Sequence, residues 1–358
     1  KIIKSGQDSY FILLFLTFMK KLQLKGLKEK LSEQINVAII GHRNPDGDAI
    51  GSTLGLKLYL DQKDINAQVI VPNDYPDFLK WLPANDQVHN YDKETDACDK
   101  ILDQADLVFT LDFNDLSRVG DDLHKKLKNL QTDFALIDHH QQPTDFAKYL
   151  FTDDEKCSTC ELIYDFIDYF NDTNRINASI STNLYTGIMT DTGSFKYAST
   201  TSHTHRVIAD LIDAGAPNNV IHKNTFDVNS LSRLQLLGLA LTQLEKIDKY
   251  QVAYIYLSRE NLEDHGFKKG DTEGFVNYAL SIKDVEMAAI FIEDIKEDYI
   301  KLSLRSKNDF DVNQFARKHF NGGGHINAAG GRCDLSLTDC IAYFKDSLTQ
   351  YPELQCES

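Results

Sequence analysis

The chain has 358 residues, of which 42% are hydrophobic and 26% are charged, as in an ordinary soluble globular protein. This length predicts about two domains, each able to bury a core of its own. The formal net charge of −16 argues against binding of long duplex nucleic acid, which is usually gripped by a basic surface. A small anionic substrate remains compatible with this charge, because metal ions and local basic side chains can reverse the field inside a cleft.

The N-terminal residues differ from the rest of the chain. Residues 10–18 are apolar-rich but too few to span a bilayer, and no Ala-x-Ala-like cleavage site follows them. Met19 would serve as the start of a cytosolic protein. We therefore expect residues 1–18 to be a leader, non-native or disordered, outside the functional fold. No stable membrane insertion is expected, and a membrane tether is the alternative interpretation.

The first half alternates apolar runs with amphipathic or polar stretches. This alternation predicts a mostly parallel sheet covered by helices on both faces. Gly51 and Gly55 lie one turn apart on one face of an expected helix, which favours close packing on the sheet. Strands are expected at 36–41, 67–71, 106–111 and 134–137, and helices at 22–34, 49–61 and 121–130.

The second half changes in character. Residues 158–246 are expected to be mainly helical, and the strongly apolar stretch 231–244 is interpreted as a helix that connects two domains. Beyond it, strands and helices alternate again, which predicts a second, smaller α/β domain. The strands are expected at 252–257, 288–293 and 299–305, and the helices at 312–319 and 337–348.

The most informative segment follows the first expected strand. His42, Asp46 and Asp48 lie within seven residues, directly after the apolar run 37–40. Hard divalent metals prefer carboxylate oxygen and accept imidazole as a borderline ligand. Because ligands of open α/β sheets bind at the carboxyl ends of the strands, this segment predicts a metal site there.

Three further acidic or histidine clusters stand at the ends of expected elements. For any one aspartate, a turn or helix cap is the alternative interpretation. Together, four clusters in the first half indicate one composite site. The three clusters are Asp112 after the run 107–111, Asp138-His139-His140 after the run 134–137, and Asp191 near the end of a helix.

Cys157-Ser158-Thr159-Cys160 is the one Cys-x-x-Cys segment. It would suit a redox pair or half of a zinc site, but no second pair with zinc-finger spacing exists. We favour the interpretation that these small residues open a helix over 161–170, with reduced thiols in a cytoplasm.

These clusters make the chain resemble the DHH phosphoesterase superfamily, which is named for the triplet present here as Asp138-His139-His140. The segment Gly322-Gly323-Gly324-His325 resembles the signature of the DHHA1 domain that is often attached to DHH domains. Within the superfamily, the size and motifs are similar to the oligoribonuclease (nanoRNase) and 3′-phosphoadenosine-5′-phosphate phosphatase group. The resemblance implies a DHH catalytic domain over 19–227, a connecting helix over 228–247 and a DHHA1 substrate-binding domain over 248–350.

The resemblance also implies a centre with two divalent metal ions. It assigns His42 and Asp46 to one ion. It assigns Asp48, His139 and Asp191 to the other, with Asp112 shared between them. The mixture of imidazole and carboxylate favours Mn²⁺, with Mg²⁺ or Co²⁺ as alternatives.

Further residues are assigned to substrate by the resemblance or by their chemistry. His140 is implied to face the substrate phosphate, as a hydrogen-bond donor or general acid, and a buried histidine bonded to backbone is the alternative. Arg118 either reaches a phosphate or pairs with a loop carboxylate. Arg305, at a strand end, suits bidentate phosphate contact, with a surface salt bridge as the alternative. Gly322, Gly323 and Gly324 would expose N–H groups in a loop and His325 would add a donor, unless they form a tight turn before a strand.

The activity that the resemblance implies is hydrolysis of short oligoribonucleotides or linear dinucleotides to nucleoside 5′-monophosphates. 3′-Phosphoadenosine 5′-phosphate is a further candidate substrate, the expected location is the cytoplasm, and a homodimer is compatible with the sequence. A phosphodiesterase for cyclic dinucleotides is the enzymatic alternative. A non-catalytic nucleotide sensor is the alternative of another class, and the presence of both Asp112 and His140 argues against it.

Overall fold

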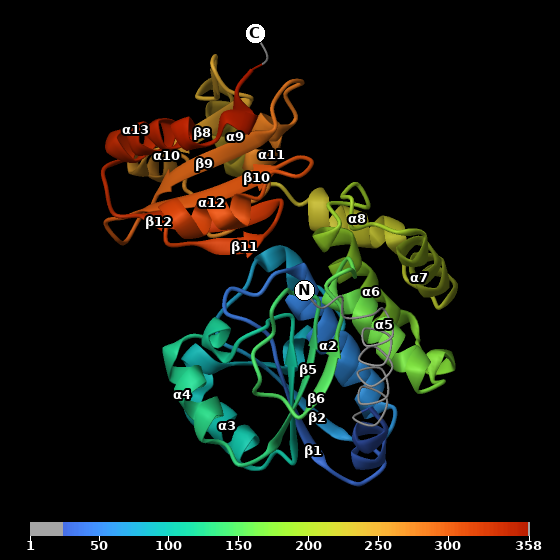
Figure 1. Cartoon of the computed structure of the whole chain (residues 1–358). Coiled ribbons are helices and arrows are strands. Elements are labelled where there is room, and N and C mark those ends of the chain that lie inside the picture. The colour runs from blue at the N-terminus through green and yellow to red at the C-terminus, as the bar shows by residue number, and fades with distance from the viewer. Residues whose placement is uncertain (1–23, 357–358) are drawn as a thin grey trace, which may run out of the picture. The chain divides into compact units, whose positions relative to one another are not determined.

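The computed structural model describes residues 24–356, which form two compact units that divide between Val228 and Asn229 (Figure 1). The leader expected over residues 1–18 lies outside the described residues. Each unit contains one six-stranded sheet with its helices, so the α/β fold class with a second, smaller α/β domain is confirmed. Among the described residues, none of the helices combines the length and apolar character needed to cross a bilayer.

The sheet of the first unit is parallel throughout, with the strand order β3-β2-β1-β4-β5-β6. From the central strand β1 the chain builds outward through β2 and β3, then returns to the other side of β1 to build β4, β5 and β6. The direction therefore reverses between β1 and β4, where open α/β sheets bind their ligands. The strands are β1 (Asn36–Ile40), β2 (Asn66–Val71), β3 (Val88–Asn90), β4 (Leu107–Leu111), β5 (Asp133–Asp138) and β6 (Tyr149–Thr152).

Helices cover both faces of this sheet, because successive side chains of a strand point to opposite faces. Val37 and Ile39 belong to the core under α2, α5 and α6, whereas Ala38 and Ile40 belong to the core under α3 and α4 (Figure 1). Residues 24–30 are also helical. The named helices are α2 (Gly47–Asp61), α3 (Tyr91–Asp103), α4 (Asp121–Asn129), α5 (Thr159–Tyr169), α6 (Ala178–Asp191), α7 (Ser202–Asp213) and α8 (Asn218–Phe226).

Two glycines of α2 serve a different contact from the one expected. A Cβ atom on Gly51 would lie 2.5 Å from the carbonyl oxygen of Asn183 and 2.9 Å from Cys160 Sγ, and one on Gly55 would lie 2.6 Å from Leu184 Cδ2. The prediction that they allow packing on the sheet was therefore wrong. Since α2 is buried on nearly every side, its glycine face receives α5 and α6 instead.

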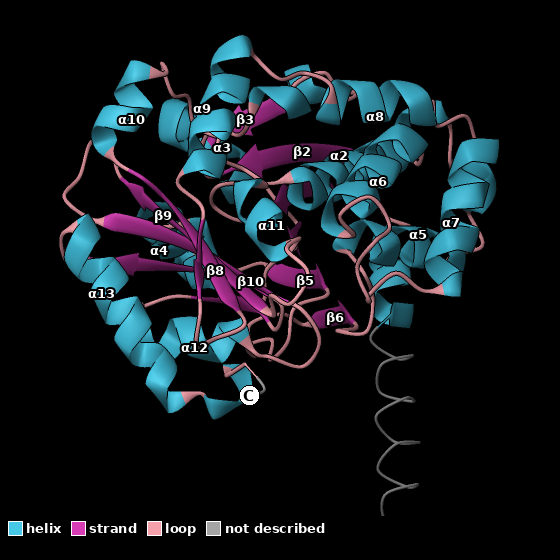
Figure 2. Cartoon of the chain, turned by 90° about the horizontal axis from the view of Figure 1, so that it is seen from above, coloured by secondary structure: helices cyan, strands magenta, loops and turns pink. Residues whose placement is uncertain are grey.

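The sheet of the second unit is mixed, with the order β11-β12-β10-β9-β8-β7. Only β8 and β9 pair in parallel, and helices lie against both faces of the sheet (Figure 2). The strands are β7 (Glu245–Ile247), β8 (Val252–Leu257), β9 (Met287–Glu293), β10 (Ile300–Ser306), β11 (Gly323–His325) and β12 (Ala328–Cys333). The helices are α9 (Leu231–Thr242), α10 (Arg259–Asp264), α11 (Phe275–Leu280), α12 (Val312–His319) and α13 (Leu337–Ser347).

The glycine-rich segment forms the edge strand β11, where a loop was expected. It pairs with β12 so closely that a Cβ atom on Gly322 would lie 1.9 Å from the carbonyl oxygen of Gly330. Gly324 has φ +154° and would bring a Cβ within 2.4 Å of the Ala328 carbonyl oxygen. The glycines are thus required by the approach of two backbones.

Candidate metal centre

The candidate centre lies where the parallel sheet changes direction. His42 follows the end of β1, and Asp112 follows the adjacent strand β4 directly. His139 follows β5, the next strand along the sheet. The carboxyl ends of these three parallel strands therefore present their side chains at one edge.

The first donor group contains His42, Asp46 and Asp112, whose ligand atoms all lie within 4.8 Å of one another. His42 Nε2 is 3.4 Å from Asp112 Oδ2 and 3.8 Å from Asp46 Oδ1. The other ring nitrogen, Nδ1, donates to the Arg43 carbonyl oxygen at 2.9 Å. A histidine whose second nitrogen is held by a carbonyl in this way is typical of metal sites.

The second donor group contains Asp48, Asp112 and His139. His139 Nε2 is 3.5 Å from Asp112 Oδ1 and 3.8 Å from Asp48 Oδ2, and its Nδ1 donates to the Lys156 carbonyl oxygen at 3.2 Å. Asp191 Oδ2 lies 3.5 Å from the same Nε2. The structure thus brings all six expected ligands together, and each oxygen of Asp112 faces a different donor group.

Local backbone structure fixes two of the aspartates. Asp112 is almost fully buried and has φ +66°, a left-handed conformation that is uncommon outside glycine and often marks functional sites. Asp46 caps α2, because its Oδ1 accepts the N–H groups of Asp48 and Ala49, both at 3.1 Å. The helix-cap interpretation therefore holds for Asp46 alongside its place in the donor group.

Carboxylates outnumber imidazoles in the centre, so it carries an excess of negative charge. Burial raises the pKa of Asp48 and raises that of Asp191 to about 7, with neighbouring carboxylates adding to both shifts. Burial disfavours the charged forms of His42 and His139, but hydrogen bonds to Asp112 and other nearby carboxylates outweigh it and raise both pKa values. Protons thus compensate the crowded carboxylates, and a divalent cation would replace them. The donor set therefore fits a metal.

His140 has a partner that the sequence did not reveal. Its Nδ1 donates to Oδ1 of the fully buried Asp138 at 2.7 Å, and the same nitrogen is 3.8 Å from Asp112 Oδ1. A carboxylate on one ring nitrogen fixes the orientation of an imidazole. The position of Asp138 in the triplet was a signal that could have identified this role.

The start of α5 contributes a second set of unexpected contacts. Asp48 Oδ2 accepts the N–H of Thr159 at 2.6 Å, and its Oδ1 accepts the N–H of Cys160 at 2.8 Å. The Thr159 hydroxyl donates to Asp112 Oδ1 at 3.1 Å. The residues of the Cys-x-x-Cys segment do open a helix, as expected, but nothing in the sequence linked that helix to Asp48.

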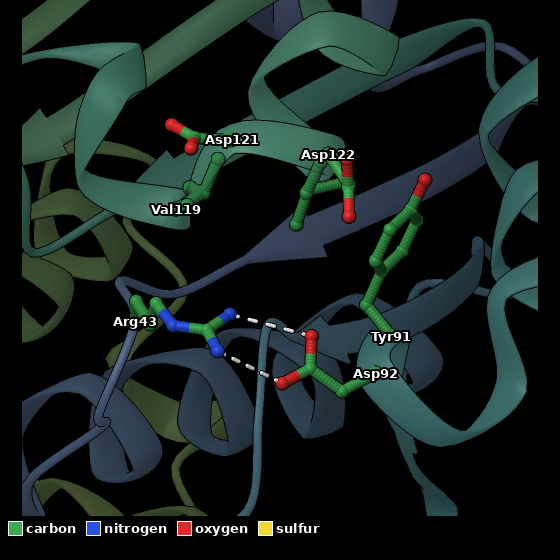
Figure 3. Close-up of a pocket in the computed structure, with 8 residues that line it drawn as sticks. Arg43, Tyr91, Asp92, Val119, Asp121 and Asp122 are labelled. Carbon is green, nitrogen blue, oxygen red and sulfur yellow. Dashed lines mark hydrogen bonds and ion pairs between the residues drawn. The ribbon is translucent and has the colours of Figure 1, made fainter. Parts of the chain in front are cut away.

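Arg43 and Arg118 lie outside the two donor groups. The Arg43 guanidinium makes two hydrogen bonds to Asp92, at 3.0 and 3.3 Å, in a pocket also lined by Asp121 and Asp122 (Figure 3). Its backbone N–H donates to the carbonyl oxygen of Arg118, an exposed residue on the short helix Leu116–Val119. Because carboxylates dominate this pocket, it is unsuited to an anionic ligand.

The candidate substrate residues of the second unit share one face of its sheet. Arg305 on β10 and His325 on β11 both pair with Ala328 of the intervening β12, so their side chains point to the same side. Arg305 also donates through Nη1 to the Leu304 carbonyl oxygen at 3.0 Å. Two of the glycine amides already donate within the protein, that of Gly322 to the Ala316 carbonyl oxygen at 3.2 Å and that of Gly324 to Asn313 Oδ1 at 3.0 Å.

A buried aspartate lies between two donor groups of imidazole and carboxylate at the switch point of a parallel sheet, an arrangement that fits a metal-dependent hydrolase. Comparison with known proteins agrees with this class. The model of the DHH family N-terminal domain matches residues 36–188, and that of the DHHA1 domain matches residues 248–351.

Relatives match along most of the chain. The chain is 30% identical over 295 residues to the bifunctional oligoribonuclease and PAP phosphatase NrnA of Thermus thermophilus. This match covers 82% of this chain and 83% of that protein. The NrnA of Bacillus subtilis, described by the same name, is 26% identical over 309 residues, covering 85% and 92%. An exopolyphosphatase-related protein from Bacteroides fragilis has a similar crystal structure, with 36% identity, a TM-score of 0.90 and coverage of 93% and 97%.

The chain therefore belongs to the DHH family of phosphoesterases, with a DHHA1 domain in its second unit. The predicted resemblance to the oligoribonuclease and PAP phosphatase group is confirmed.

Proposed function

We propose that this protein is a two-metal phosphoesterase that hydrolyses short oligoribonucleotides and linear dinucleotides to nucleoside 5′-monophosphates. 3′-Phosphoadenosine 5′-phosphate is proposed as a further substrate. The observation that carries the proposal is Asp112, whose two oxygens face two separate donor groups. The substrate class is supported by relatives of matching extent, whose names give oligoribonuclease and PAP phosphatase activities.

The proposed ligands follow the two donor groups. His42 and Asp46 would hold one ion, and Asp48, His139 and Asp191 the other, with Asp112 shared. In hydrolases, the chemistry that such a metal pair supplies is activation of water and neutralisation of charge on phosphate. The mixed imidazole and carboxylate set favours Mn²⁺ over Mg²⁺, and Co²⁺ is a further candidate.

His140 is proposed as the residue that faces the phosphate. Because Nδ1 donates to Asp138, the proposed contact with a phosphate oxygen or with the leaving oxygen would be made through Nε2. Asp138 would hold the imidazole ring in the orientation that this contact needs. His140 would therefore act on substrate rather than as a metal ligand.

Substrate binding by the second unit is proposed to involve Arg305, His325 and the segment Gly322–Gly324. Their shared sheet face supports this assignment, since a guanidinium and an imidazole on one face suit an anionic ligand. Arg118 is proposed to contact phosphate from the first unit. A cytoplasmic location and a homodimer remain predictions.

The test is a substrate panel with metal-free protein to which Mn²⁺, Mg²⁺ or Co²⁺ is added back. The panel contains a dinucleotide, a pentanucleotide, a much longer RNA, 3′-phosphoadenosine 5′-phosphate and a cyclic dinucleotide. We expect Mn²⁺-dependent release of nucleoside 5′-monophosphates, fastest from the shortest RNAs. Faster cleavage of the cyclic dinucleotide would establish the alternative phosphodiesterase. Nucleotide binding without any hydrolysis would establish a sensor.

A further inference from the structure

Thr159, the first residue of α5, contacts two of the proposed metal ligands at once. Its backbone N–H donates to Asp48 Oδ2 at 2.6 Å, and its hydroxyl donates to Asp112 Oδ1 at 3.1 Å. The side chain is fully buried. The two aspartates lie 111 and 47 residues earlier in the chain, so one residue joins the start of α2 to the end of β4.

We propose that Thr159 is a positioning residue that sets the orientation of the Asp112 carboxylate relative to Asp48. This inference rests on the proposed metal centre. A carboxylate attached to a strand end can rotate about its last bond, and only one orientation of its plane presents one oxygen to each donor group. The hydroxyl of Thr159 holds Oδ1 on the side of His139, which leaves Oδ2 on the side of His42.

Asp48 is fixed by the same helix end. Both of its oxygens accept backbone N–H groups, from Thr159 and Cys160, so its carboxylate is held in one plane. Backbone donors at a helix N-terminus favour a negative charge. The carboxylate can still offer lone pairs to a cation, because each oxygen has more than one acceptor site.

Thr159 itself is held firmly. Ser158 caps α5, with its hydroxyl accepting the Glu161 N–H at 3.0 Å. The buried carboxylate of Glu161 accepts the Cys157 N–H at 3.0 Å and the Thr204 hydroxyl at 2.9 Å, which anchors the start of α5 to α7. A shift of Thr159 would therefore disturb a connected buried network.

A purely structural threonine would behave differently, and α6 supplies one for comparison. Thr182 is buried, and its hydroxyl donates to the Ala178 carbonyl oxygen of its own helix at 2.6 Å. It contacts no carboxylate of the centre through that hydroxyl. Thr182→Val therefore removes a buried threonine hydroxyl without touching the proposed ligands.

The experiment compares Thr159→Val, Thr159→Ala, Thr159→Ser and Thr182→Val with the parent protein. Mn²⁺ affinity and stoichiometry are measured by calorimetric titration of the metal-free protein, thermal unfolding is followed in chelator, and kcat and KM are determined separately. Loss of a residue that orients a metal ligand typically weakens metal binding about 10- to 100-fold. In Thr159→Val we expect the affinity for one ion to fall by this amount, and kcat to fall with little change in KM. Thr159→Ser and Thr182→Val should match the parent protein in metal affinity, kcat and KM.

The contrary results are distinct. Parent affinity for two ions in Thr159→Val would overturn the inference, even if its Tm fell, since the hydroxyl would then serve stability alone. Equal weakening in Thr159→Ser and Thr159→Val would also overturn it. If Thr159→Val does not fold, Thr159→Ala carries the same comparison. If the parent protein binds no Mn²⁺, the proposed metal centre and this inference are both overturned. If the parent protein binds Mn²⁺ and the Thr159 variants bind it equally well, only this inference is overturned.

Discussion

The sharpest prediction concerns Asp112→Asn. An amide has the size of the carboxylate but lacks its charge and offers one oxygen instead of two. Only one donor group would keep an oxygen ligand, and the other would face an NH₂ group. We therefore expect metal stoichiometry to fall from two ions to one and turnover of a dinucleotide to collapse.

The magnitude follows from the charge that the substitution removes. The Asp112 side chain is 3% exposed, so solvent screens its carboxylate little. Two unit charges about 4 Å apart interact by about 4 kcal/mol at an effective dielectric constant of about 20. Loss of that attraction corresponds to roughly a thousandfold weaker metal binding.

Asp115→Asn is the matched control. Asp115 is three residues further along, its Oδ1 accepts the Ser117 N–H at 2.8 Å, and asparagine serves as well as aspartate in such a cap. Metal content and turnover are measured on the same preparations of both variants. If Asp112→Asn retained two bound ions and near-parental turnover, the shared-carboxylate assignment would be refuted.

Three further predictions test other parts of the centre. Gly187→Ala should destabilise the protein by about 1–3 kcal/mol, the usual cost of overpacking, because its Cβ would lie 2.2 Å from Cys160 Sγ and 2.9 Å from Asp48 Oδ1. Gly238→Ala, whose Cβ would meet nothing within 4 Å, is the control, and an equal Tm in both would contradict this packing. Asp138→Asn should keep both ions but lower kcat roughly 10²-fold or more, because His140 loses the partner of its Nδ1. Loss of a metal ion in this variant would instead show that His140 or Asp138 is a ligand. The metal-free protein should become less stable as pH rises from about 5 to about 8, because the raised pKa values of Asp48, Asp191, His42 and His139 mean that the folded state binds more protons than the unfolded state. A Tm that rose over this range in chelator would contradict that sign.

The cluster of candidate ligands was predictable because its aspartate and histidine residues stand at the ends of apolar runs. His42, Asp46 and Asp48 follow one strand, and a parallel sheet brings the ends of neighbouring strands to one edge. Pattern alone could therefore place side chains from distant parts of the chain together. The same apolar runs correctly predicted β1, β4 and β5, the strands that are buried on both faces of the sheet.

The contacts that orient the candidate ligands were not predictable, because they depend on helix packing. Nothing local to Thr159 or Cys160 shows that their N–H groups meet Asp48, more than 100 residues earlier. Likewise, Gly51 and Gly55 showed that something approaches α2 closely, but not that it is another helix.

The sequence patterns also failed to predict several short or polar strands and helices. The edge strands β3 and β6 have three and four residues, too few for an alternating pattern to be recognised. Helix α3 buries only Tyr91, Cys98 and Leu102, carries many charged residues and is interrupted by a non-helical backbone conformation at Glu94, so it offers little apolar sequence by which to recognise it.

The left-handed backbone at position 112 restricts which amino acids this position can accept. With φ +66°, the conformation favours glycine, asparagine and aspartate, although Ala84 and Phe195 adopt similar φ values of +66° and +65° in this protein. A carboxylate shared by the two proposed metal ions would add a preference for a negative charge. Asparagine keeps the backbone preference but loses the charge, whereas glutamate keeps the charge and loses the backbone preference. In a survey of all single substitutions, we expect asparagine to lower activity more than abundance and glutamate to lower both.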